Sequence, residues 1–173
     1  MREIASVSLS ELMEFTRWER CQWREHLSAH GDAALGTSVG PHGDGRISTV
    51  GELIKHIFIA EKHHVDRLSN RPITDVSRIP GDTVDKLFAF GERTRQDLAA
   101  FVAAEPADDW DVPREYNING KMVSVTPRKF IAHILLHEVR HWAQIATLLR
   151  LNGITGNFPD FLFSPVMAGT TKR

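Results

Sequence analysis

Four segments with apolar side chains at helical spacing limit what this chain can fold into. They cover residues 9–30, 50–69, 83–105 and 127–152, and the segments between them are rich in glycine and proline. An amphipathic helix buries its apolar face against other helices, and four such helices most simply form a bundle. We therefore expect an all-α four-helix bundle, built as a single domain over residues 1–173.

Capping signals mark where these helices begin. Two helices open with a capping box, in which a hydroxyl and a carboxylate satisfy free backbone amides: Ser8 with Glu11, and Thr49 with Glu52. Asp82 or Thr83 is expected to cap the third helix. Thr126 is expected to cap the fourth, because Pro127 then falls in the first turn, where a missing N–H costs nothing.

The helical spacing of apolar residues is interrupted just before the last helix. Residues 115–118 and 121–125 are short segments that flank Asn119 and Gly120. An Asn-Gly pair favours the type I′ turn of a β-hairpin, since both residues accept a positive φ. We expect a short hairpin here.

Two further segments carry expectations of their own. Residues 31–46 are rich in glycine and include Pro41, so we expect a long mobile loop, which could cover a functional site. The aromatic segment 158–165 is expected to pack on the bundle or on a second subunit.

Charge and composition exclude some classes of partner. With 21 basic and 22 acidic residues the net charge is -1, which gives no electrostatic reason to bind nucleic acid or an anionic membrane. Cys21 is the only cysteine, so no intrachain disulfide is possible, and we expect a small buried side chain there. We find no signal peptide and no apolar run long enough to cross a membrane, and we expect a cytoplasmic protein.

Histidine is unusually frequent, with nine residues. His137 and His141 lie one turn apart on the same face of the fourth helix, and His56 lies beside Leu53 and Ala60 on the apolar side of the second. Imidazoles buried together lose hydrogen bonds, and a shared metal ion restores partners for them. We predict one divalent transition ion, Zn²⁺, Ni²⁺ or Fe²⁺, with positions left open for chemistry.

Other polar residues near these histidines are candidates for supporting roles. Glu61, Glu138 and Gln144 could orient the rings, as partners of metal-bound histidines commonly do. Glu61 and Glu138 are also the candidate catalytic residues, as general bases, with His64 as a further candidate.

The sequence resembles the DinB/YfiT-like superfamily of metal-dependent enzymes. The motifs occur in the order usual for that family and span residues 8–163: Thr49-Val-Gly-Glu-Leu-Ile-Lys-His56 with Glu61 after it, His133-x3-His137-Glu-x2-His141-x2-Gln144, Leu149-Arg-Leu-Asn-Gly153 and Pro159-Asp160-Phe161. The resemblance implies a bundle, often a homodimer, that binds a metal through His56, His137 and His141. This chain differs from many members at Trp142 and Ala143, where they have Arg-Gly. A large ring therefore follows His141, the last expected ligand.

Members of this superfamily include transferases and isomerases that use low-molecular-weight thiols, and some hydrolases. The resemblance therefore implies a metal-dependent transferase or hydrolase with a small-molecule substrate, such as a low-molecular-weight thiol. One alternative is a non-enzymatic metal-binding bundle that serves in stress or interaction. Another is a ferritin-like di-iron site. It would use two Glu-x-x-His pairs, Glu61 with His64 and Glu138 with His141, and one inward glutamate from each of the other two helices, for instance Glu19 and Glu92.

Overall fold

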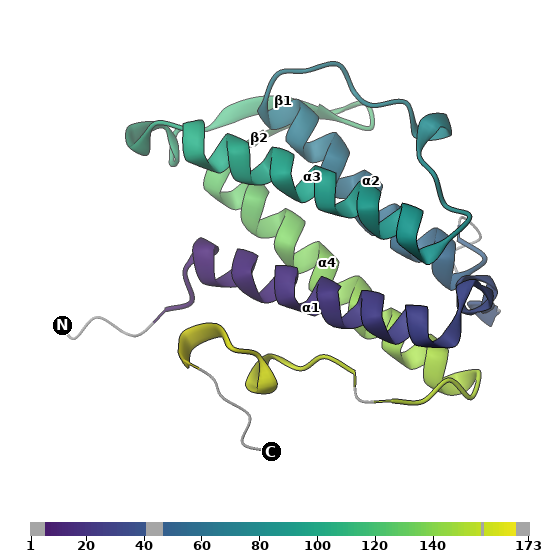
Figure 1. Ribbon diagram of the computed structural model, residues 1–173. Coiled ribbons are helices and arrows are strands. Elements are labelled where there is room, and N and C mark those ends of the chain that lie inside the picture. The colour runs from purple at the N-terminus through teal and green to yellow at the C-terminus, as the bar shows by residue number, and fades with distance from the viewer. Residues whose placement is uncertain (1–5, 41–46, 157, 169–173) are drawn as a thin grey trace.

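The computed structural model describes residues 6–40, 47–156 and 158–168. Its helices are α1 (Leu9–His30), α2 (Val50–Leu68), α3 (Val84–Ala104) and α4 (Pro127–Leu151). Both α1 and α2 pack on α3 and on α4, so the order around the bundle is α1, α4, α2, α3 (Figure 1). The expected all-α four-helix bundle is confirmed.

The predicted caps are found at the helix starts. Ser8 Oγ accepts a hydrogen bond from the Glu11 amide, and the Glu11 carboxylate accepts one from the Ser8 amide. Thr49 and Glu52 form the second capping box. Thr83, one of the two candidates, caps α3, and Thr126 caps α4 ahead of a proline in the first turn. Each helix therefore begins where its own sequence satisfies the free amides.

A β-hairpin precedes α4, as expected. Its strands β1 (Arg114–Ile118) and β2 (Lys121–Val125) pair antiparallel, with Tyr116 opposite Val123. Asn119 and Gly120 have φ values of 53° and 83°, the two positive values of a type I′ turn. The buried Tyr116 ring lies 4.8 Å from the ring of Phe130, so the hairpin packs on the first turn of α4.

The segment after α1 differs from the mobile loop that we expected. Asp32–Gly36 forms a short 3-10 helix, in which Ala34 and Leu35 are buried. Leu35 lies so close to Gly51 that a Cβ there would come within 3.0 Å of the leucine side chain. The expectation was therefore wrong for this part of the segment, because two apolar residues attach it to the start of α2. Residues 41–46 lie outside the described part of the chain.

The C-terminal segment runs along α1 (Figure 1). Phe158 stacks on Trp23 at 5.2 Å, and Phe161 meets Phe15 edge to face at 4.9 Å. The aromatic tail thus packs on the bundle, one of the two expected positions. Within residues 6–40, 47–156 and 158–168, no helix is long and apolar enough to cross a membrane.

Candidate metal centre

The structure brings His56, His137 and His141 together where α2 packs on α4. The ring of His56 lies 5.1 Å from the ring of His137 and 5.0 Å from that of His141. The two Nε2 atoms of His137 and His141 are 3.0 Å apart. One nitrogen from each ring lies within 4.8 Å of the others. The fold therefore brings three imidazoles from two helices together, as the sequence predicted.

These spacings fit a single small ion. With metal–nitrogen bonds of about 2.0–2.1 Å, tetrahedral ligands lie about 3.4 Å apart. The observed nitrogen separations start at 3.0 Å and stay within 4.8 Å, so small rotations about the side-chain bonds suffice. Among the described residues this is the one group of three such side chains that could hold an ion. The donor set of three imidazoles suits Zn²⁺, Ni²⁺ and Fe²⁺ alike.

Gln144 sets the state of one ring. Its Oε1 accepts a hydrogen bond from Nδ1 of His141 at 2.6 Å, which leaves the lone pair on Nε2, the atom that faces His137. Burial lowers the pKa of His141, and burial together with the neighbouring rings and Arg140 lowers that of His137 to about 3. Both rings are therefore neutral near pH 7, the form that binds metals.

A cavity of 540 Å³ adjoins the histidines. It is lined by Ile47, Glu52, Lys55, His56, Ile59, Arg140, His141 and Gln144. Arg140 and Gln144 are exposed, so the cavity opens to solvent. Ile47, the first described residue after position 40, lines one side of the cavity. An open volume next to three ligands is what a catalytic metal site requires, whereas a structural site is closed.

Two cations in this cavity were not predicted from the sequence. Arg140, which was not assigned a role, has a guanidinium nitrogen 3.4 Å from Nε2 of His141. Lys55 immediately precedes His56, and its aliphatic stem passes next to Gly81. The sequence did indicate the position of Arg140. It lies three residues after His137, and residues three apart are neighbours on the same face of a helix.

Glu61 and Glu138, the candidate catalytic residues, lie elsewhere. They are 2% and 1% exposed and pair with Arg20 and Arg95. Glu138 receives hydrogen bonds from Arg20 Nε at 2.5 Å and from Arg95 at 2.5 Å. We call these four residues, one from each helix, the buried quartet. Neither carboxylate lines the histidine cavity, since both are taken up by arginines.

The remaining candidates are also placed. His64 is packed on Phe130 and His133, away from the three-histidine group. The di-iron alternative is contradicted, because its glutamates and histidines do not form a metal-binding group among the described residues. Glu92 is partly exposed beside Arg17, and Glu61 and Glu138 belong to the buried quartet.

The structure also places Trp142, and it corrects the expectation for Cys21. Trp142 does not face the cavity: it is fully buried, stacks on Trp23 at 5.3 Å and donates a hydrogen bond to Glu138. The large ring that distinguishes this chain is therefore a core residue, despite its place after His141. Cys21 is exposed, contrary to the expectation that it is buried.

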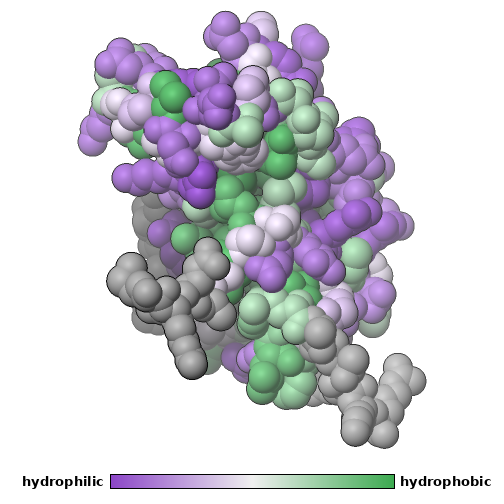
Figure 2. Space-filling model, turned by 90° about the vertical axis from the view of Figure 1, so that its left-hand side faces the viewer, coloured by the Kyte–Doolittle hydropathy of each residue, from purple (hydrophilic) through white to green (hydrophobic). Residues whose placement is uncertain are grey.

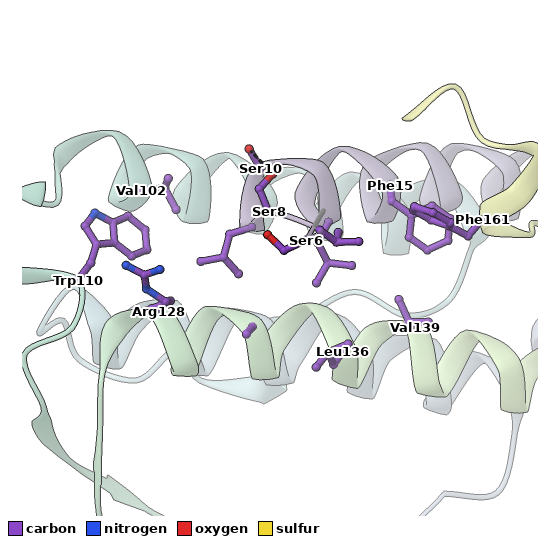
Figure 3. A pocket seen from close by; sticks show the side chains of 14 residues that line it. Ser6, Ser8, Ser10, Phe15, Val102, Trp110, Arg128, Leu136, Val139 and Phe161 are labelled. Atoms are coloured by element: carbon purple, nitrogen blue, oxygen red, sulfur yellow. Dashed lines mark hydrogen bonds between the residues drawn. The ribbon is translucent and has the colours of Figure 1, made fainter. Parts of the chain in front are cut away.

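A larger cavity, of 1010 Å³, lies between α1 and α4. Figure 2 shows hydrophobic side chains gathered at the centre of the face that carries it. Trp110 and Arg128 lie at one end and Phe15 and Phe161 at the other, with Leu136 on the α4 side (Figure 3). Among the residues that the structure describes, its lining holds no histidine or carboxylate, and Arg128 pairs with an aspartate at 2.7 Å. The side chains able to do chemistry are therefore in the smaller cavity.

Comparisons with known proteins agree with this architecture. A crystal structure of a DinB-like protein from Bacillus subtilis, YjoA, has a similar fold, with a TM-score of 0.57 and 16% sequence identity over 88% of this chain and 96% of that one. A comparison with curated proteins gave no match. The family model of the DinB superfamily matches residues 15–145, a span that includes parts of all four helices and all three histidines, and the chain belongs to that superfamily.

Proposed function

We propose that this protein is a metal-dependent enzyme that holds one divalent transition ion, Zn²⁺, Ni²⁺ or Fe²⁺, on His56, His137 and His141. The observation that carries the proposal is the set of three imidazole nitrogens within 4.8 Å of one another beside an open cavity. Membership of a typically metal-binding superfamily supports it. The reaction proposed is a transfer that uses a low-molecular-weight thiol, or a hydrolysis.

The chemistry divides between the ion and the chain. When bound, the ion lowers the pKa of a water or thiol next to it, so that a nucleophile is available near neutral pH. Gln144 holds the His141 ring with Nε2 toward the site. The cavity leaves room for a small substrate beside the three ligands. Glu52, the one carboxylate in the described lining, accepts hydrogen bonds from the Ser48 and Thr49 amides.

Glu61 and Glu138 receive a different role in this proposal from that of general base. Each lies on a helix that supplies ligands, and Arg95 pairs with both of them at 2.9 and 2.5 Å. Arg20 also pairs with both carboxylates. The arginines thus tie α2 to α4, and the position of His56 relative to His137 depends on that connection. We propose that the two glutamates position the ligands.

The test compares two histidines of α4. Elemental analysis of untagged protein is expected to give close to one transition ion per chain. The His137→Ala variant is expected to lose the ion, and the matched His133→Ala variant, one turn earlier and outside the group, to keep it. A wild-type protein that stays metal-free after incubation with Zn²⁺, Ni²⁺ and Fe²⁺ would rule out the metal centre.

A second experiment addresses the reaction. Metal-loaded protein is incubated with low-molecular-weight thiols and electrophilic acceptors, and with ester and amide substrates, and the His137→Ala variant is the blank. Turnover that needs both the ion and the thiol supports the transferase, and turnover without the thiol supports the hydrolase. Metal-loaded protein that is inert in both screens would favour the non-enzymatic alternative.

Two expectations stay predictions. The resemblance to dimeric relatives predicts a homodimer, which light scattering of the purified protein measures directly. The sequence also predicts a cytoplasmic protein, which fractionation of the source cells tests.

A further inference from the structure

The described lining of the histidine cavity is positively charged. Neutral imidazoles add no negative charge, so a divalent ion held by them keeps its full charge. Lys55 and Arg140 add two positive charges. Against them stands Glu52, whose carboxylate is held by two backbone amides of a helix cap. A cavity of this kind attracts an anion.

Arg140 is placed to bind such an anion. Among the residues that the structure describes, it forms no ion pair, whereas Arg20 and Arg95 are each paired with two carboxylates. Its guanidinium donates toward Nε2 of His141 at 3.4 Å, a long contact with the atom that a metal ion would take. Once that lone pair is occupied, the guanidinium needs another acceptor next to the ion. A planar guanidinium matches an oxyanion with two parallel hydrogen bonds.

We propose that the substrate of this site carries an oxyanion, a carboxylate or a phosphate, which Arg140 binds directly beside the metal position with help from the charge of Lys55. The inference rests on the proposed function, since it concerns a ligand of the same cavity. It makes Arg140 a residue that determines specificity: it binds the charged end of the substrate, and the reacting group lies toward the histidines.

The test uses two small thiols that differ in one group. Protein loaded with Co²⁺ is titrated with mercaptoacetate and with mercaptoacetamide, and the visible absorption of the cobalt site reports binding. Because the two thiols differ in acidity, the quantity compared between proteins is the ratio of their dissociation constants. The variants are Arg140→Gln, Arg140→Lys and Lys55→Gln. Arg150→Gln is the matched control, because it removes the same charge from α4 at a residue that stacks on Phe158.

The expected result is that Arg140→Gln shifts the ratio by about tenfold against mercaptoacetate, the size of one charge-assisted hydrogen bond in a solvated site. Arg140→Lys and Lys55→Gln are expected to shift it less, and Arg150→Gln not at all. Displacement of mercaptoacetate by acetate or by inorganic phosphate then shows which oxyanion is preferred.

Two outcomes separate the inference from the proposed function. If Co²⁺ binds the wild type but Arg140→Gln leaves the ratio unchanged, the oxyanion site is overturned and the metal centre stands. If the wild type binds no Co²⁺ and no other transition ion, the proposed function fails and the inference fails with it.

Discussion

Two polar clusters include side chains of α4, and they differ in whether their charged groups have partners of opposite charge. The buried quartet takes Arg20, Glu61, Arg95 and Glu138 from the four helices, and its two positive charges balance its two negative ones. The histidine group, between α2 and α4, adjoins an open cavity whose described lining has more cations than carboxylates.

The difference indicates what each cluster does. Charges that are fully paired and dry have no capacity left for a ligand, and losing one partner leaves an unpaired buried charge. Neutral nitrogens with lone pairs, next to a cavity, contribute less to the fold but can bind an ion. The first cluster therefore holds the helices, and the second is the one available for function.

The largest expected effect comes from neutralising one member of the quartet. Glu138→Gln leaves Arg20 and Arg95 with the carboxylate of Glu61 alone, so one buried positive charge is unbalanced, and breaking a buried pair in this way costs about 3–5 kcal/mol. Urea unfolding followed by circular dichroism measures the loss. Glu92→Gln, at a partly exposed glutamate near Arg17, is the control and should change stability by less than about 0.5 kcal/mol. Equal midpoints for the two variants would break the distinction between the clusters.

A pH effect is expected at Glu19, next to the quartet. Burial, and then the charge of Glu138, raise the pKa of Glu19 from 4.5 to about 8. Because the folded state favours the protonated acid, the stability it contributes is complete below about pH 4.5 and is lost as the pH rises toward 8. Relative to Glu19→Gln, the wild type should lose on the order of 3 kcal/mol over this range. Urea midpoints at pH 5, 6.5 and 8 measure it, and parallel curves would contradict it.

A smaller loss is expected where two helices meet over the quartet. A Cβ at Gly91 would lie 2.8 Å from the ring of Phe58, and the carbonyl of Gly91 accepts a hydrogen bond from Arg20 at 2.9 Å. Gly91→Ala should therefore push α3 away from α2 and cost about 1–3 kcal/mol in thermal or urea unfolding. Gly36→Ala, where the added methyl meets nothing, is the control. An unchanged midpoint for Gly91→Ala would show that the helices can separate freely.

The smallest effect is expected at the histidines. In metal-free protein, His137→Ala should cost less than about 1 kcal/mol, because the ring is only half-buried. Excess Zn²⁺ should raise the melting temperature of the wild type, and a chelator should reverse the rise, since a ligand of the folded state adds stability. The variant should show neither response. A variant that responds like the wild type would move the ion to another site.

Most of the fold was predictable because its signals are local. Ser8, Thr49 and Thr126 mark helix starts through contacts within one turn, and Asn119-Gly120 sets its own turn. The histidine group was found in the same way, since His137 and His141 share a face whatever the rest of the chain does.

What was missed depends on contacts between distant segments. Arg20 and Arg95 lie on the buried faces of their helices, a local signal that was available, but their partners lie up to 118 residues away. Without those partners, Glu61 and Glu138 looked like free carboxylates. The cavity, and with it Lys55 and Arg140, exists only once α2 and α4 are packed. Leu35 packs the 3-10 helix Asp32–Gly36 against the start of α2, which the glycine-rich composition of the segment did not reveal.

The quartet also has a consequence for the folding kinetics. Because each helix supplies one charge, an assembly of three helices keeps at least one arginine or glutamate without its partner, and that group retains its water. Packing such a three-helix intermediate more tightly therefore gains little stability, because the unpaired charge would lose its water. We therefore expect refolding to follow a single exponential, with a barrier at which the last helix docks and the four groups are dehydrated together.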